Sequence, residues 1–184
     1  MILFFVNATE IVLSLLPDTV QNTGSHTDCA FLQKLSAYYV TDEMMQPLKE
    51  AFQSLEATQK NNIKSLIIHG DFEDQEIHQL DKELSSFDQL EDLNIRGRFG
   101  NKGALVWSKI CSHVKHLKRL SIWGLYSDQG AKALVECFKQ HPTLESINIW
   151  AFRSLLDSLQ SQVREEFPEG EISTWYLKLT KKIV

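Results

Sequence analysis

The octet RGRFGNKG, at residues 96–103, combines three glycines with two arginines and a lysine. Backbone amides in a glycine-rich turn can bind an anion, and basic side chains add to that binding, so this composition could hold phosphate or RNA. The octet lacks the GxxxxGK[ST] spacing of a nucleotide-binding loop. Equivalent octets at residues 69–76 and 123–130 read HGDFEDQE and WGLYSDQG, one acidic and one close to neutral. A dedicated phosphate site would not tolerate this variation, so we interpret the octet as a structural turn.

The segment CSHVKH, at residues 111–116, offers one cysteine and two histidines as potential metal ligands. However, Cys111 falls among the apolar positions of a predicted helix, which favours a buried thiol. The chain contains no GxSxG or HExxH motif, and its remaining histidines have no ligand spacing. We therefore expect no metal, no cofactor and no catalytic residues.

The composition is that of an ordinary globular domain. The chain has 184 residues, a formal net charge of −5 and 43% hydrophobic residues, enough for one domain with a substantial core. Cys29, Cys111 and Cys137 are widely spaced and form no CxxC motif, which favours a reducing, cytoplasmic compartment. The net negative charge argues against nucleic acid as a partner.

The N-terminal segment MILFFVNATEIVLSLLPD is apolar but has no basic residue and is interrupted by Glu10. A signal peptide has a positive N-terminal region, and a membrane span needs about 18 or more apolar residues. We therefore expect neither a signal nor a membrane segment. The prediction for this part is a buried capping strand, a helix from about Thr9 and a flexible loop over residues 18–28.

The strongest pattern in the chain is a 27-residue repeat. The three octets share a glycine in second place, an aromatic residue in fourth place and Asp or Asn in sixth place, and each begins 27 residues after the previous one. An apolar LxxLxL pattern precedes them and recurs, beginning at Ile63, Leu90, Leu117 and Leu144. ISTWYL, at residues 172–177, repeats this pattern one residue beyond the next step.

Each repeat predicts a strand, a turn and a helix. In LxxLxL the fourth and sixth positions point inward, and positions three, five and seven point outward. Asp74, Asn101 and Asp128 then occupy the places expected of helix N-caps. The residues that follow are apolar at i, i+3, i+7 and i+10, which indicates one buried helix face. These positions are Ile77, Leu80, Leu84 and Phe87; Ala104, Trp107, Cys111 and Val114; and Ala131, Leu134 and Phe138, with His141 in the last place of the third set.

These units resemble the leucine-rich repeat family, and their strand-plus-helix length resembles its ribonuclease-inhibitor-like subclass. The resemblance implies a right-handed α/β solenoid with a parallel sheet on the concave side and helices on the convex side. One departure is that glycines stand near the place where the family has a ladder of asparagines. We assign residues 1–184 to a single such domain. Its parts are an N-terminal cap and loop (1–34), an irregular repeat (35–62), repeats 63–89, 90–116, 117–143 and 144–171, and a terminal strand (172–184).

The outward strand positions form columns across the predicted sheet, and such a sheet is a binding surface. Position seven holds His69, Arg96, Trp123, Trp150 and Lys178; position five holds Ile67, Asn94, Ser121, Asn148 and Tyr176; position three holds Ser65, Asp92, Arg119, Ser146 and Thr174. Trp, Tyr and Arg dominate interface hot spots, so the position-seven column favours partner binding. The alternative is a structural role, either as a cation–π ladder whose members bind only one another or with the tryptophans covered by the turn that follows each strand. The predicted partner-binding residues are His69, Asn94, Arg96, Arg119, Trp123, Trp150, Tyr176 and Lys178.

Charge is segregated along the repeats. Residues 71–92 are rich in acid, whereas the stretch from Arg96 to Arg119 contains basic residues and no acid. This pattern could steer a charged partner, or the opposite charges could pair across neighbouring repeats. The second position alternates Lys64, Glu91, Lys118 and Glu145, which predicts exposed pairs between adjacent strands.

These observations favour an intracellular interaction module that binds a protein partner and has no chemistry of its own. It could be an adaptor or scaffold, including an effector that a bacterium delivers into host cells. A second hypothesis is the ligand-sensing repeat fragment of a larger intracellular receptor, because a strand so near Val184 leaves little C-terminal cap. Such a weakly capped end could also form a homodimer. A third is an enzyme-regulating domain, which would show a deep pocket with converging polar groups.

Overall fold

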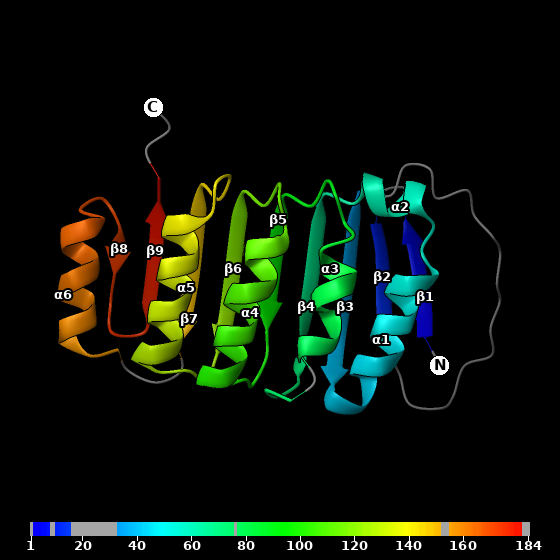
Figure 1. Ribbon diagram of the computed structural model, residues 1–184. Helices are drawn as coiled ribbons and strands as arrows, with labels where there is room; N and C mark the ends of the chain where they lie inside the picture. Colours follow the sequence, from blue (N-terminus) through cyan, green and yellow to red (C-terminus); the bar gives the residue numbers. More distant parts are fainter. Residues whose placement is uncertain (1, 8–9, 16–32, 76, 152–154, 182–184) are drawn as a thin grey trace.

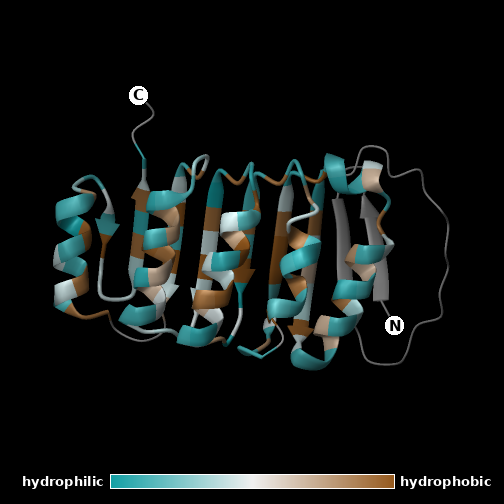
Figure 2. Ribbon diagram, viewed as in Figure 1, coloured by the Kyte–Doolittle hydropathy of each residue, from teal (hydrophilic) through white to brown (hydrophobic). Residues whose placement is uncertain are grey.

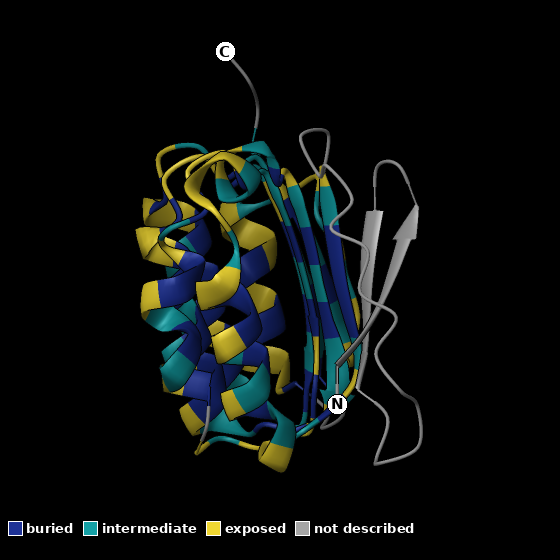
Figure 3. Cartoon of the chain, turned by 90° about the vertical axis from the view of Figure 1, so that its right-hand side faces the viewer, coloured by how far each residue is buried: buried dark blue, intermediate teal, exposed yellow. Residues whose placement is uncertain are grey.

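A computed structural model describes residues 2–7, 10–15, 33–75, 77–151 and 155–181, with side chains described from residue 33 onward. The described residues form an α/β structure in which one open sheet carries helices on one of its faces (Figure 1). Viewed along the sheet, the helices that the structure describes lie on one side of the strands, and none of them covers the other face (Figure 3). We call this second face the open face.

The strands are β1 (Ile2–Asn7), β2 (Glu10–Leu15), β3 (Lys34–Thr41), β4 (Ser65–Asp71), β5 (Asp92–Arg96), β6 (Arg119–Gly124), β7 (Ser146–Ala151), β8 (Glu171–Ile172) and β9 (Tyr176–Thr180). The helices are α1 (Asp42–Ser54), α2 (Ala57–Asn62), α3 (Asp81–Leu84), α4 (Asn101–His113), α5 (Asp128–Gln140) and α6 (Asp157–Glu166), with a 3₁₀ turn, η1 (Ile77–Leu80). The strand order is β1-β2-β3-β4-β5-β6-β7-β9-β8, and β2 to β7 are parallel.

From β4 to β7 each strand residue pairs with the residue 27 positions later in the sequence, so the period of the sequence sets the register of the sheet. Leu66 pairs with Leu93, which pairs with Leu120, which pairs with Ile147. Because side chains alternate between the two faces of a strand, this register places equivalent residues of each unit in columns. From β4 to β7 the predicted inward columns are therefore buried, and the predicted outward columns line the open face. In the last unit the prediction is wrong: Trp175, expected to point inward, precedes β9 and is 51% exposed, and Thr180 rather than Thr174 pairs with Ser146.

The core lies between the sheet and the helices, where Figure 3 shows the buried residues. Every helix position predicted from the i, i+3, i+7, i+10 pattern is buried. Figure 2 shows that the outer turns of the helices are mostly hydrophilic, as expected for helices with one apolar face. In the unit 63–89 the apolar residues of that face lie on η1 and the short α3 rather than on one long helix.

The aromatic residues in fourth place of the octets form a second repeating feature of the core. Phe72 stacks on Phe99 with ring centroids 6.0 Å apart, and Phe99 stacks on Tyr126 at 5.9 Å. A β-carbon at Gly97 would lie 2.7 Å from the ring of Phe72, which explains the glycine in second place. In the octets 96–103 and 123–130, the glycine in second place, Gly97 or Gly124, thus makes room for a buried aromatic stack.

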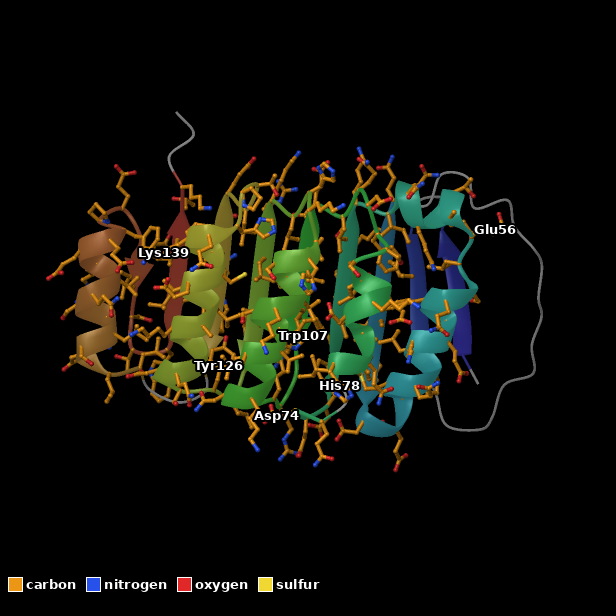
Figure 4. The ribbon with its side chains drawn as sticks, in the orientation of Figure 1. Glu56, Asp74, His78, Trp107, Tyr126 and Lys139 are labelled. Carbon is orange, nitrogen blue, oxygen red and sulfur yellow. The ribbon has the colours of Figure 1, made fainter. Side chains whose placement is uncertain are left out.

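The octet residues in sixth place are caps, but each caps the helix of the next unit rather than that of its own unit. The Asp74 carboxylate accepts hydrogen bonds from the amides of Gly100 (2.7 Å) and Gly103 (2.8 Å), at the start of α4. Asn101 Oδ1 accepts from Ser127 and Gly130, and Asp128 accepts from Leu156. Figure 4 shows Asp74 at the edge of the molecule where α4 begins. The prediction that each residue caps its own helix is therefore wrong, because the acceptors reach forward to the next unit.

Two further predictions are corrected by the sheet. The helix expected from about Thr9 is instead strand β2, which pairs antiparallel with β1 and parallel with β3. The β-branched and leucine-rich segment EIVLSL suits a strand, and pairing satisfies its backbone amides. The loop expected over residues 18–28 lies outside the described residues. The terminal strand β9 is antiparallel to β7, which reverses its expected register.

Candidate functional site

A continuous stack of side chains crosses the open face at the seventh position of the strands. The guanidinium of Arg96 lies 5.1 Å from the ring centroid of Trp123. Trp123 stacks on Trp150 at 4.6 Å with a 25° interplanar angle, and Trp150 packs on Tyr176 at 4.1 Å. We call these four residues the stripe. The stripe joins β5, β6, β7 and β9, four neighbouring strands of the sheet.

The spacing of the sheet explains the stack. Neighbouring strands lie about 4.8 Å apart, close to the distance at which aromatic rings stack, so in-register rings on adjacent strands meet face to face. The faces of Trp123 and Trp150 are consequently turned toward each other, and the two rings are half-buried. What the stripe presents to a partner is therefore ring edges, which carry positive partial charge, together with the Arg96 guanidinium.

The reversed direction of β9 exchanges two predicted site residues. Tyr176 pairs with Trp150 and completes the stripe, whereas Lys178 pairs with Asn148 in the fifth column. The Tyr176 hydroxyl donates to Asn148 Oδ1 (3.4 Å), and Asn148 Nδ2 donates to Ser121 Oγ (3.2 Å). Lys178 forms an ion pair with Glu171 of β8. Tyr176 therefore belongs to the stripe and Lys178 does not.

On the other side of Arg96, two predicted residues form a polar contact. His69 Nε2 donates to Asn94 Oδ1 over 3.0 Å, linking β4 and β5 on the open face. The ring of His69 meets that of Tyr38 edge to face at 5.6 Å. These contacts extend the aromatic surface onto β3, where sequence analysis placed no site residue.

A groove of about 410 Å³ lies beside His69 and Arg96, over β3 and β4. It is lined by Tyr38, Tyr39, Thr41, His69, Gly70, Asp71 and Arg96. A bulge in β3 builds its wall, because Ala37 pairs with Ile68 and Val40 with Gly70, so two tyrosines stand opposite a single residue of β4. A β-carbon at Gly70 would lie 1.8 Å from the Val40 carbonyl oxygen, so only glycine allows the bulged strand to approach.

Tyr39 stands out in this bulge. Its φ of 60° lies in the left-handed region, which side chains with a β-carbon rarely adopt. Its side chain is nevertheless 73% exposed, so burial of the ring does not repay that strain. The sequence contained one signal, the doublet Tyr38–Tyr39 inside an alternating strand, but period-two alternation does not reveal an inserted residue.

The eighth predicted residue, Arg119, is engaged within the sheet. Its Nη2 donates to Asp92 Oδ2 over 2.6 Å, and its Nε donates to the other oxygen of the same carboxylate. This hydrogen bonding raises the pKa of Arg119. Arg119 and Asp92 lie side by side in the third column, two columns away from the stripe. A bidentate pair leaves Arg119 less able than Arg96 to bind a carboxylate of a partner.

The acidic and basic segments pair with each other across neighbouring units. The ion pairs are Arg98–Asp71, Lys118–Glu91 and Arg119–Asp92, and His113 Nδ1 lies 2.9 Å from Asp81 Oδ1. The predicted second-position pairing is confirmed for Lys118 and Glu91, whose atoms lie 3.0 Å apart, and the hydrogen bond lowers the pKa of Glu91. Pairing of opposite charges reduces the surface dipole that their separation in the sequence suggested.

The segment CSHVKH is divided between the core and the surface. Cys111 is fully buried, and burial raises its thiol pKa well above the usual range. His113 faces outward and pairs with Asp81, and His116 is exposed. Within the part of the chain that the structure describes, no group of three or more His, Cys, Asp or Glu side chains is placed to hold a metal ion.

No protein-family model matches this chain, and no curated protein matches its sequence. Among the described residues, no helix has both the length and the apolar character needed to cross a membrane.

Proposed function

We propose that this chain is an interaction module of the leucine-rich repeat type, a right-handed solenoid that binds a protein partner on the open, concave face of its sheet. In this proposal it has no catalytic activity and works inside the cell as an adaptor or effector. The in-register stacking of 27-residue strand–turn–helix units supports the architecture. The free thiols of Cys111 and Cys137 support a reducing environment.

The observation that carries the proposal is the stripe itself. Arg96, Trp123, Trp150 and Tyr176 place four side chains of hot-spot type in one line on the open face. The polar residues beside them, among them Asn94, Ser121 and Asn148, are partly exposed, as in the rim of an interface. Because the stack holds these rings in place before binding, association would cost little side-chain entropy.

The stripe also stabilises itself, and this does not compete with binding. The same contacts that form a cation–π and aromatic ladder leave the ring edges and the guanidinium facing outward. A surface that is ordered without its partner is pre-organised for that partner.

The test is affinity capture followed by mass spectrometry with two double variants. Arg96→Glu with Trp123→Ala alters the stripe, and Lys109→Glu with Leu105→Ala makes the same kinds of change at exposed positions of α4. We expect a discrete partner to bind the native chain and the α4 variant and to be lost from the stripe variant, at equal melting temperature. Equal capture by all three proteins would contradict the proposal.

A further inference from the structure

We infer that the groove beside the stripe receives an acidic side chain, Asp or Glu, that a partner protein presents next to an aromatic or aliphatic residue. The inference rests on the proposed function and specifies the chemistry of its partner. The groove belongs to the same surface, since Arg96 lines it and also ends the stripe at Trp123.

Arg96 is the group that would bind the carboxylate. One side of its guanidinium lies over the ring of Trp123, which orients it, and its side chain is exposed and lines the groove. A guanidinium presents several N–H donors in one plane, so stacking on an aromatic face leaves the donors at its edge able to bind a carboxylate. Among the arginines of the open face, Arg119 already holds Asp92 in this way.

The charges around the groove favour an anion. Asp71 is the acidic residue among the lining side chains, and its carboxylate lies 3.4 Å from Nε of Arg98. That pair is close to neutral, so among the lining residues that the structure describes no unpaired acid offsets the charge of Arg96. The edges of the aromatic rings and the histidine ring add positive partial charge to the walls.

The aromatic residues that line the groove favour an apolar residue next to the acid of the partner. Tyr38 and Tyr39 form an aromatic wall, and Tyr39 is held outward by its left-handed backbone in the β3 bulge. An apolar residue beside the acid would pack on this wall while the acid reaches Arg96. The strain at Tyr39 thus has a use, because backbone conformations of this kind persist at binding sites where they position a side chain.

The experiment is selection from a random-peptide phage library on the immobilised full chain, followed by affinity measurements with synthetic peptides. We expect the selected sequences to share an Asp or Glu beside an aromatic or aliphatic residue. Replacing that acid by its amide should weaken binding at least about tenfold, as for a charge-assisted hydrogen bond. The acid and amide peptides should bind the Arg96→Gln variant equally.

Three variants serve as controls for this selection. Lys109→Gln removes the same charge from α4 and should leave the preference for the acid unchanged. Asp71→Asn removes the negative charge at the groove and should strengthen binding of the acidic peptide. Trp150→Ala tests whether a peptide uses the stripe without touching a groove residue. All variants are compared at equal melting temperature.

The outcomes separate the inference from the function on which it rests. Peptides that require Trp150 but show no acid preference, or keep it on Arg96→Gln, would overturn the inference and leave the proposed function standing. If no selected peptide depends on the stripe, both fail. An acid preference that Arg96→Gln abolishes and Lys109→Gln preserves supports both.

Discussion

Asp74 and Gly103 belong to successive units, yet the carboxylate of the first lies 2.8 Å from the amide of the second. The same oxygen accepts from the amide of Gly100, so one side chain binds two free amides at the start of α4. A β-carbon at Gly103 would lie 2.5 Å from that oxygen. The contact therefore depends on a matched acid and glycine, one unit apart, and Asn101 and Gly130 repeat it.

Removing this cap should destabilise the chain. We expect Asp74→Ala to lower the free energy of unfolding by about 1 kcal/mol, because two amides of α4 lose their protein acceptor. Urea denaturation measures the change. The control is Glu73→Ala, whose exposed side chain can be removed while its amide still donates to Asp42. Equal loss in both variants would contradict a capping role.

Replacing Gly103, the glycine that faces Asp74, should also destabilise the chain. We expect Gly103→Ala to cost roughly 1–3 kcal/mol, although alanine is the better helix former, because its β-carbon would also lie 2.5 Å from the β-carbon of Phe99. At Gly100 the nearest atom to an added β-carbon is 3.5 Å away, an ordinary contact. Gly100→Ala should therefore be near neutral, and a similar cost at both positions in chemical denaturation would refute the steric argument.

The cation–π contact in the stripe should contribute a measurable coupling free energy between Arg96 and Trp123. A double-mutant cycle of Arg96→Ala and Trp123→Ala should give a coupling of about 0.5–1 kcal/mol, because the guanidinium lies over the indole ring. The comparison cycle combines Arg98→Ala with Trp123→Ala, because Arg98 pairs with Asp71 and not with the indole ring. Thermal or urea unfolding should show coupling only in the first cycle. Coupling absent from both would mean that the stack does not persist in solution.

The left-handed backbone of Tyr39 can be tested by comparing glycine with alanine at one site. We expect Tyr39→Gly to be more stable than Tyr39→Ala by about 1 kcal/mol, because a β-carbon is strained at φ of 60°. At the neighbouring Tyr38 the order should reverse, since glycine weakens an ordinary strand position. The readout is the urea midpoint of the four variants. Alanine favoured at both sites would show that residue 39 is not left-handed.

Stability should fall in mild acid because of His141. Its Nδ1 accepts from the amides of Thr143 and Leu144, and its Nε2 donates to the carbonyl of Val114, so the buried ring is neutral. Burial lowers its pKa below the usual 6.5. The unfolded chain therefore binds a proton first, and the stability that neutral His141 contributes, complete above about pH 6.5, is lost as the pH falls below it.

Denaturation across this pH range should show a smaller loss in His141→Asn, which keeps an acceptor but does not titrate. His116 is exposed at the surface, so His116→Gln serves as the matched variant. We expect the native pH dependence to persist in His116→Gln. An unchanged profile in His141→Asn would rule out the buried ring as its source.

Much of this architecture could be predicted from the sequence because it depends on period. The spacing of 27 residues sets the register of β4 to β7, and alternation within each strand decides which side chains are buried. The columns that contain Arg96, Trp123 and Trp150 follow from that register alone. Local patterns determine such features because every unit repeats the same spacing of apolar residues, glycines and turns.

Only the tertiary structure decided the features that depart from the 27-residue period or that the period does not specify. Alternation reads the same in both directions, so it could not show that β9 runs antiparallel and exchanges Tyr176 for Lys178. Spacing alone could not show that Asp74 caps α4, because in a repeating chain its own helix and the next one are equally well placed in sequence. The bulge at Tyr39 exists because β3 must pair with β4 while carrying one extra residue, a demand that arises only when the strands meet.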